Sequence, residues 1–465
     1  MERDRKQDVV FALVRNVVSI RYEDLPAEAV EATKKDILDT LATTLAGSTS
    51  NGIKVVQELV CDWGGKKEST IIVYGGKVPS LNAALVNATM AHACDYDDYH
   101  SLTAIHAGVS AIPASLAIAE RRGKITGKEF ITAIALGIDL MCRLGISVGL
   151  MPATHGWHNT SVYGAFGSTA ACGKILGLDE NKMINALGIV YSQAAGNAQC
   201  MRDGALSKRM QPGFAAKAAV LSSLLAEKGY TGARSSLEGK YGLFNVYHRG
   251  KYDPTALTFE LGKSFEVCNL AFKPYPSCGL THNAIGATLE LVSQYNIKPE
   301  MVDKIVVSMG EDSQHVVCEP VEIKRRPQVA VDAQFSLPYT VARAVVHRKV
   351  CLGDLSPEAF TDEITLQVAQ RVEPRLMAEL TTQRGLDPAI VEIKTMDGKA
   401  YSKRMDIPKG NPKNPLTMND LVEKFRDCAS YSAKSIPQKS IERAIQLTLN
   451  LEEVEDIRQI IRLLS

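Results

Sequence analysis

The segment EATKKDILDTLATTLAGS, residues 31–48, carries the clearest helical pattern in the chain. Its large apolar residues recur at positions i, i+1, i+4 and i+8 and share one helical face: Ile37, Leu38, Leu41 and Leu45. Gly47 stands where a helix commonly ends in a glycine cap. The pattern predicts an amphipathic helix packed on a helical core.

Amphipathic helical patterns extend over about residues 7–265. Several of these segments are rich in Ala, Gly and Ser, and small residues let helix backbones approach closely. We therefore expect a compact bundle, with further helices at 80–93, 109–121, 127–146, 161–176, 180–195 and 212–228.

The pattern changes after about residue 266. Residues 302–310 and 389–398 look like strands, and the second runs into an Asp-Gly turn that predicts a hairpin. Amphipathic helices are expected around them, at 278–294, 334–347 and 362–374. The proline-rich PKGNPKNP then leads back to helix, which suggests that the end of the chain packs on the first domain.

The fold class predicted from these patterns is mainly α. A large all-helical domain is expected from residues 1–267 together with 406–465. A smaller α+β domain is expected from residues 268–405.

Composition narrows the function classes. The 465 residues exceed one usual core, and 45% hydrophobic with 23% charged residues is typical of a globular protein. With 53 Lys and Arg against 52 Asp and Glu, no overall field favours nucleic acid or an anionic membrane. An anionic ligand must be caught by a local site.

The first residues and the cysteines indicate a cytoplasmic protein. MERDRKQDVVFALVRNVV is charged and its apolar stretch is interrupted by Arg15, unlike a signal peptide or a membrane span. Ten cysteines occur without any C-x-x-C spacing, which argues against a zinc knuckle or a disulfide framework.

One dense cluster of ionisable groups is AHACDYDDYH, residues 91–100, with five such side chains: His92, Asp95, Asp97, Asp98 and His100. The carboxylates follow the predicted helix 80–93, at the end where the helix dipole disfavours them. No H-x-x-x-H or calcium-loop spacing accompanies them. A metal site, an acid/base centre and a solvated acidic loop are all open interpretations.

A second histidine loop, THGWHNTSVYGAFGS (154–168), places His155 and His158 just before a helix start. Histidines there have a lowered pKa and serve as neutral bases or donors, although a ring bonded to a backbone carbonyl is the plain alternative.

Two further loops carry cations. In RDGALSKRMQPG (202–213), Lys208 and Arg209 stand between two predicted helices, where a carboxylate or phosphate is well held. In FKPYPSCGLTHNAIGA (272–287), Lys273 and Cys278 precede a helix, a position that can lower a thiol pKa. Solvated surface cations and an inert thiol are the alternatives.

Several common motifs are absent from the sequence: G-x-G-x-x-G after a strand, the P-loop, G-x-S-x-G and H-E-x-x-H. What is left is His, Asp, Lys and Tyr in loops. That set suits proton transfer next to a carboxylate, with cations holding the carboxylates and stabilising an enolate.

Six motifs in this order resemble the MmgE/PrpD family: AHACDYDDYH, HAGVSAIPASLAIAE, GWHNTSVYGAFGSTAACGKILGL, KPYPSCGLTH, AQFSLPYTVA and GNPKNPLTMNDLVEKF. The family includes 2-methylcitrate dehydratase, cis-aconitate decarboxylase and iminodisuccinate epimerase. The resemblance runs through nearly the whole chain. It implies a helical domain made from both chain ends, an inserted α+β lid, a homodimer and an active site between the domains, with no metal or organic cofactor.

The resemblance also implies site residues. Asp95 matches the active-site aspartate, His106 the histidine of an H-P-G-like turn, and His158 that of GWH. We expect His106 and His158 to be the acid/base pair, with Asp95 orienting or tuning one of them. Three further matches are expected to grip carboxylates or donate a hydrogen bond from the lid: Lys208, Lys273 and Tyr339.

The substrate contacts depart from those of the decarboxylase. Tyr99 stands where that enzyme has threonine and Cys278 where it has histidine, and we expect both, with Arg209, to line the substrate site. Gln211 stands where the family often has a histidine. Asp97 and Asp98 are expected to cap or brace the loop.

The leading functional hypothesis is a cofactor-independent lyase, a dehydratase or decarboxylase acting on a carboxylate such as 2-methylcitrate or cis-aconitate. An epimerase or isomerase of a small dicarboxylate needs the same proton-transfer groups and is the alternative. A non-catalytic carboxylate-binding protein and a metal hydrolase built on residues 95–106 are further readings.

Overall fold

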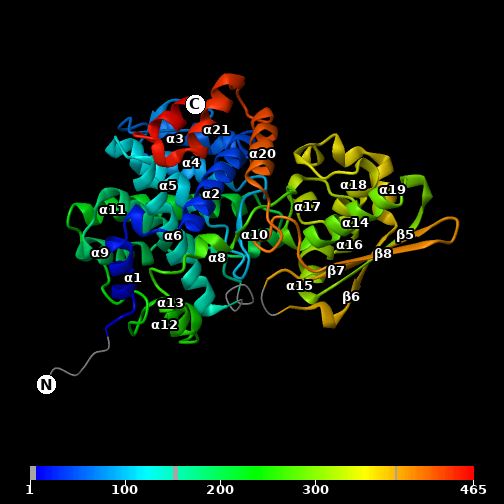
Figure 1. The fold of residues 1–465 in the computed structure, drawn as a ribbon, viewed down its shortest axis with the longest axis horizontal. Coiled ribbons are helices and arrows are strands. Elements are labelled where there is room, and N and C mark those ends of the chain that lie inside the picture. Colours follow the sequence, from blue (N-terminus) through cyan, green and yellow to red (C-terminus); the bar gives the residue numbers. More distant parts are fainter. Residues whose placement is uncertain (1–6, 150–155, 383–384) are drawn as a thin grey trace. The chain divides into compact units, whose positions relative to one another are not determined.

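The computed structural model describes residues 7–149, 156–382 and 385–465, and the chain divides into two compact units (Figure 1). The helical unit comprises Met1–Ala93, Asp97–Leu270 and Thr417–Ser465. The α+β unit comprises Cys94–Tyr96 and Ala271–Leu416. The predicted fold class, mainly α with a smaller α+β part, is confirmed.

The core of the helical unit is a set of long helices packed on one another, with α8 against α6 and α11, and α4 against α5 and α11. Their bounds are α2 (Ala27–Gly47), α4 (Ser80–Ala91), α5 (Gly108–Arg122), α6 (Gly127–Val148), α8 (Asn159–Leu176) and α11 (Ser207–Glu227). At the α6–α8 crossing, a Cβ on Gly167 would lie 2.4 Å from the carbonyl oxygen of Gly137. The small residues in these segments therefore let two backbones touch.

Shorter elements surround this core. They are α1 (Val10–Ser19), α3 (Ile53–Trp63), α9 (Glu180–Tyr191), α10 (Gln199–Arg202), α12 (Leu243–His248), α13 (Pro254–Thr258), α20 (Met418–Ser430), α21 (Gln438–Leu449), α22 (Arg458–Leu463) and the strand pair β1 (Ser69–Thr70) and β2 (Lys77–Val78).

Helix α2 is buried on more than its apolar face. Its predicted apolar residues are in the core, but Asp36, Asp39 and Thr40 on the other side are also at most 1% exposed. Asp36 and Thr40 face the start of α5, where Gly108 lies against them. Asp39 is covered because α20 and α21 return from the end of the chain and pack on α2, as Figure 1 shows in orange and red beside the blue helices. The Lys424 ammonium of α20 lies 2.7 Å from Asp39 Oδ1, so the carboxylate is neutralised inside the unit.

Helix α6 is long and apolar enough to cross a membrane by length and composition. However, 94% of its most apolar window is buried inside the helical unit. A core helix of a soluble protein has the same composition, so α6 is explained by its packing against α8.

The α+β unit is built on a four-stranded sheet of order β6-β5-β7-β8. β5 (Val302–Met309) is parallel to β6 (Val372–Leu376) and antiparallel to β7 (Ala389–Thr395), which forms the predicted hairpin with β8 (Ala400–Met405). Its helices are α14 (His282–Gln294), α15 (Glu311–Ser313), α16 (Val321–Arg325), α17 (Ala330–Gln334), α18 (Leu337–His347) and α19 (Glu363–Gln370).

Several predicted helices begin or end a few residues away from the expected positions, and two of these differences matter most. The helix expected at 362–374 ends at Gln370 and β6 follows, because Pro374 cannot donate a helical hydrogen bond and disfavours helix in the residue before it. The helix expected from 212 begins at Ser207 and continues through Pro212, whose missing N–H removes one intrahelical bond. Lys208 and Arg209 therefore lie on a helix rather than in a loop.

The ten cysteines are free thiols and most are buried, as expected for small apolar residues.

The Asp39–Lys424 pair provides a test of how the C-terminal helices hold the unit together. Lys424→Met leaves a carboxylate buried without its cation, so we expect unfolding free energy to fall by about 3–5 kcal/mol in denaturant melts. Asp39→Leu combined with Lys424→Met removes both charges and should recover most of that loss. A double variant as unstable as the single one would show that the ammonium acts through packing.

Candidate functional site

The centre of the helical unit gathers three imidazoles around one carboxylate. Asp97 Oδ2 lies 2.8 Å from His92 Nδ1 and is hydrogen-bonded to it. The same oxygen lies 2.7 Å from His106 Nδ1, in a charge-pair contact whose angles are not those of a hydrogen bond. The His92 ring centroid is 4.7 Å from that of His106 and 6.1 Å from that of His158. One oxygen atom thus positions two rings, and His158 completes the cluster.

Local structure explains where His92 and His106 lie. His92 is the C-cap residue of α4, and the chain then turns so that Asp98 caps α5: its carboxylate accepts from the backbone N–H groups of Ala107 at 2.9 Å and Gly108 at 3.1 Å. Asp98 therefore braces the loop, as predicted, and holds His106 directly before a helix N-terminus. Asp97 does not cap the loop; it is the carboxylate of the histidine cluster.

Gly108 has a steric role at this point. A Cβ there would lie 2.3 Å from Thr40 Oγ1 and 2.6 Å from Asp36 Oδ1. Contacts this short are never accepted by real Cβ atoms, so only glycine lets α5 begin against α2.

His158 comes from a different part of the sequence. It is the N-cap residue of α8, its backbone N–H donates to Gly196 O at 3.1 Å, and its side chain is buried. Its Nδ1 has no hydrogen-bond partner among the residues that the structure describes. His155, the other histidine of the predicted loop, lies outside the described residues.

Burial and nearby positive charge set the protonation states. Burial, followed by Lys208 and His106, lowers the pKa of His92 to about 4 against the pull of Asp97. Burial, His92, Lys208 and His106 together lower the pKa of His158 well below its ordinary value. Burial alone would raise the pKa of Asp97, but the two imidazoles outweigh it and hold that pKa well below the usual range. At neutral pH, a charged carboxylate faces rings of which at least His92 and His158 are neutral.

The cation of the cluster is Lys208. It is 7% exposed in the first turn of α11, and its charge acts on both His92 and His158. Arg209, expected beside the substrate, is also buried and its Nη1 donates to Asn51 O at 3.1 Å. That guanidinium is thus engaged with the turn before α3.

Asp95 and Lys273 form a separate pair within the α+β unit. The Lys273 ammonium is 2.8 Å from Asp95 O and 3.0 Å from Asp95 Oδ2, and both side chains are buried. Asp95 has a φ of 51°, a left-handed conformation uncommon for residues other than glycine. In this structure the Asp95 carboxylate is paired with Lys273, and the carboxylate that lies against the histidines is that of Asp97, so the orienting role expected for Asp95 stays a prediction.

Tyr339 was expected to donate a hydrogen bond to substrate. In the structure its hydroxyl, on α18, donates to Asp354 O at 2.9 Å, and the residue is 1% exposed. Burial raises the pKa of this phenol. Because a hydroxyl has one proton, this one is committed inside the α+β unit, and Tyr339 acts as a core residue.

The expected specificity residues are found in two different environments. Tyr99 is buried in the short strand β3 (Tyr99–His100) of the helical unit. Cys278 is half-buried, packs on the core of the α+β unit, and its N–H donates to Gln334 O at 2.8 Å.

Sequence reasoning missed the role of His92. The decapeptide 91–100 was singled out, but no spacing rule connects a helix C-cap histidine with a carboxylate five residues later. Only the turn that follows α4 brings Asp97 back against it.

The spacing of the same side chains argues against a metal ion between them. His92, Asp97 and His106 offer one ligand atom each within 4.8 Å, and two imidazoles with a carboxylate suit zinc or iron. Ligand atoms sharing one such ion, each about 2.1 Å from it, are separated by roughly 3.0–3.4 Å. The 2.8 Å between Asp97 Oδ2 and His92 Nδ1 is a hydrogen-bond distance, the 2.7 Å between Asp97 Oδ2 and His106 Nδ1 is also shorter than two ligands of one ion keep, and the Lys208 charge opposes a cation.

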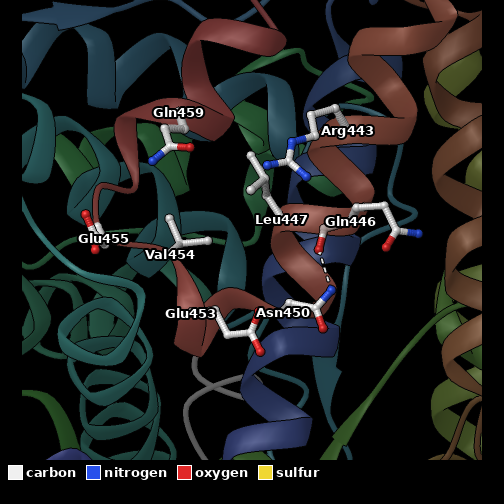
Figure 2. A pocket seen from close by; sticks show the side chains of 8 residues that line it. All are labelled: Arg443, Gln446, Leu447, Asn450, Glu453, Val454, Glu455 and Gln459. Atoms are coloured by element: carbon white, nitrogen blue, oxygen red, sulfur yellow. Dashed lines mark hydrogen bonds between the residues drawn. The ribbon is translucent and has the colours of Figure 1, made fainter.

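The C-terminal helices carry an open hollow between Arg443 and Gln459 (Figure 2). Its lining is mostly amides and opposite charges, with no histidine or cysteine, and one amide is satisfied locally by the Asn450-to-Gln446 hydrogen bond.

Two models of the family that the sequence motifs resemble match this chain, one after the other. The MmgE/PrpD N-terminal domain matches residues 12–255 and the MmgE/PrpD C-terminal domain matches residues 275–452.

Curated relatives cover the full length. A cis-aconitate decarboxylase of Aspergillus terreus is 28% identical, over 100% of this chain and 97% of that protein. A cis-aconitate decarboxylase-like protein of Aspergillus oryzae is 27% identical over 98% and 97%, and the cis-aconitate decarboxylase of Homo sapiens is 26% identical over 96% and 92%. With both domain families matched over most of its length, the chain belongs to the MmgE/PrpD family.

Proposed function

We propose that this lyase of the MmgE/PrpD type acts on a small di- or tricarboxylate by acid/base proton transfer, without a metal or organic cofactor, and that cis-aconitate is the first substrate to test. The observation that carries the proposal is the buried cluster of His92, His106 and His158 around the charged Asp97, beside Lys208. The printed names of the full-length relatives support the choice of substrate.

His158 is the base and His106 the acid in this proposal. The lowered pKa of His158 keeps its ring neutral, and its Nδ1 has no protein partner in the described part of the chain. His106 Nδ1 lies 2.7 Å from Asp97 Oδ2, and a carboxylate in this position orients an imidazole for proton donation. His92 holds Asp97 from the other side and keeps it oriented.

The same groups account for either lyase reaction. In decarboxylation, the carbon–carbon bond to the departing carbon dioxide breaks, its electron pair stays on the carbon, and the acid supplies one proton there. In dehydration, the base takes the α-proton while the acid protonates the leaving hydroxyl. Lys208 suits the grip on a carboxylate in both cases, and Lys273 is the second candidate cation.

An epimerase acting on a small dicarboxylate is the alternative. Tyr99 and Cys278 depart from the decarboxylase pattern, which favours a different substrate shape. Epimerisation uses the same base and acid and has no leaving group. Uptake of deuterium at the α-carbon without elimination would support an epimerase rather than a lyase.

Turnover of a carboxylate should depend on His158. With cis-aconitate, 2-methylcitrate and citrate, ultraviolet absorbance and carbon dioxide release should reveal conversion, and His158→Asn should lower kcat/KM by about 10²–10⁴-fold. His315→Asn, a change at an exposed histidine, should leave kcat/KM unchanged. Full activity in folded His158→Asn would remove the base from the mechanism.

The pH dependence of kcat/KM should follow from the pKa of the base. The base must be neutral, and burial with nearby positive charge lowers the pKa of His158, so it stays neutral as pH falls through 6.5, the ordinary histidine value. The acidic limb of the kcat/KM profile should therefore lie below pH 6.5. A limb at or above that value would point to an unshifted histidine as the base.

We also propose that the enzyme is a homodimer. An exposed apolar stripe runs along α3 through Val55, Leu59 and Trp63, which are 66%, 47% and 54% exposed. It continues onto the start of α11, where Leu206 and Phe214 are 43% and 50% exposed.

A second copy of the chain is the occupant that fits this stripe. A twofold contact requires a self-complementary patch, and the Lys54–Glu58 ion pair gives the edge of the stripe both signs of charge. Apolar area gathered on two neighbouring helices is also typical of subunit interfaces.

Light scattering should therefore give twice the chain mass of 50.5 kDa. Leu59→Glu combined with Phe214→Glu should give the single mass, because it places charges inside the contact. Tyr230→Glu, an equally exposed apolar-to-charged change outside the stripe, should not. A monomeric unmodified protein would contradict the proposal.

A further inference from the structure

Trp157 stands directly before His158 and has no part in the proposed mechanism. It is half-buried and forms an isolated antiparallel bridge with Asn197. Two main-chain hydrogen bonds close the bridge: His158 N donates to Gly196 O at 3.1 Å, and Ala198 N donates at 2.8 Å to the carbonyl oxygen before Trp157. The main chain at His158 is therefore held by a loop, residues 194–198, that is distant in the sequence.

Gln211 holds the outer edge of this bridge. In a bridge closed by these two bonds, the N–H and C=O of Asn197 point away from Trp157. Gln211 pairs with both groups, since its Oε1 accepts from Asn197 N at 2.9 Å and its Nε2 donates to Asn197 O at 2.8 Å. A primary amide has the donor and the acceptor of a peptide group, so Gln211 binds Asn197 as a neighbouring strand would. The side chain is 6% exposed and comes from α11, one turn after Lys208.

Tyr247, on α12, contacts both of the bridged segments. Its ring stacks on that of Trp157, with the ring centroids 4.5 Å apart and the planes 1° from parallel. Its hydroxyl donates to Ala194 O at 2.6 Å, at the start of the loop. The ring and the hydroxyl of one side chain thus tie the segment before His158 to the loop that pairs with it.

The two helices that carry these side chains are each attached to α8, the helix that the proposed base caps. On α12, His248 is buried and its Nε2 is hydrogen-bonded to the Tyr163 hydroxyl of α8 at 3.0 Å. On α11, the main-chain oxygen of Gln211 accepts from Ser161 Oγ of α8 at 3.0 Å. Both side chains therefore reach the bridge from helices whose positions are fixed by packing.

The position of this main chain matters because a base must lie within hydrogen-bond reach of the proton that it takes. His158 Nδ1 has no hydrogen-bond partner among the described residues, so no protein contact at that nitrogen corrects a shift of the backbone. A misplacement of about 1 Å can lower turnover about 10²-fold.

We propose that Gln211 and Tyr247 are positioning residues for the reaction: together they clamp the Trp157–Asn197 bridge and so hold the His158 main chain where its ring can take the substrate proton. The inference deepens the proposed function and rests on His158 being the base. Both residues act through the position of His158 rather than through contact with the substrate.

Gln211→Met and Tyr247→Leu each remove one arm of the clamp. Both changes should lower kcat about 10- to 100-fold and leave KM nearly unchanged, because the base is displaced while the groups that hold the carboxylates stay in place. Tyr247→Phe keeps the stacked ring and should retain most of the activity. Because the two residues act on one bridge, the double variant should lose less than the product of the two single losses in kcat.

Hydrogen exchange followed by mass spectrometry reads the clamp itself, without substrate. The peptides that contain Asn197 and His158 should exchange faster in Gln211→Met and in Tyr247→Leu, because their N–H groups lose a fixed partner.

Tyr252→Leu is the matched control. Tyr252 stacks on Phe244 of α12, with the ring centroids 4.1 Å apart, and its hydroxyl donates to Glu238 Oε1 at 2.6 Å, but it is not part of the bridge. The change removes the same kinds of contact as Tyr247→Leu. It should lower the thermal stability in the same way and leave kcat and the exchange at His158 unchanged.

An unchanged kcat, or unchanged exchange at His158, in folded Gln211→Met and Tyr247→Leu would overturn the inference. A loss of kcat in Tyr252→Leu as large as in Tyr247→Leu would overturn it as well. If the exchange changes as expected but the unmodified protein turns over no carboxylate, the proposed function fails and the clamp on the bridge stands.

Discussion

A carboxylate buried without water has to be neutralised, and the helical unit is organised around four of them: Asp36, Asp39, Asp97 and Asp98. Each is compensated differently. Asp39 has the Lys424 ammonium, Asp98 has two backbone N–H groups, and Asp97 has two imidazoles. Asp36 has no hydrogen-bond partner among the described residues, and burial with the neighbouring carboxylates raises its pKa well above the usual range. Burial and Asp97 raise the pKa of Asp98 well above the usual range too, despite its two N–H donors, so the protonated acid is favoured at this pair.

These compensations connect structure to chemistry. The partner of Asp39 comes from α20, so the return of the C-terminal helices is part of what makes α2 a core helix. The partners of Asp98 are the first N–H groups of α5, which places His106 beside Asp97. A site for proton transfer therefore arises from the same contacts that neutralise buried charge, and its geometry is as rigid as the packing around it.

The histidines of the cluster come from two separate parts of the chain. His92 and His106 flank the turn between α4 and α5, whereas His158 is the N-cap residue of α8 and its backbone N–H donates to Gly196 O, next to the Asn197 that Gln211 of α11 binds. Helices α8 and α11 pack closely because of their small residues. The many glycines and alanines of these helices thus bring Lys208 on α11 near enough for its charge to add to burial in lowering the pKa of His158 on α8.

The sequence by itself determined the main helices, the β7–β8 hairpin, the family and the kinds of groups that do the chemistry, because periodicity, turn residues and motif order are local or linear properties. Only the tertiary structure decided which groups are partners. Asp95 and Asp97 are two residues apart, yet the left-handed φ of Asp95 accompanies its pairing with Lys273, while Asp97 faces the histidines. Tyr339 likewise matches a motif, but its hydroxyl donates to a carbonyl in the core of the α+β unit, and Gln211, a departure from that pattern, binds the N–H and the carbonyl oxygen of Asn197. Hydrogen-bond partners depend on the approach of remote segments to within about 3 Å, and no pattern along the chain encodes that distance.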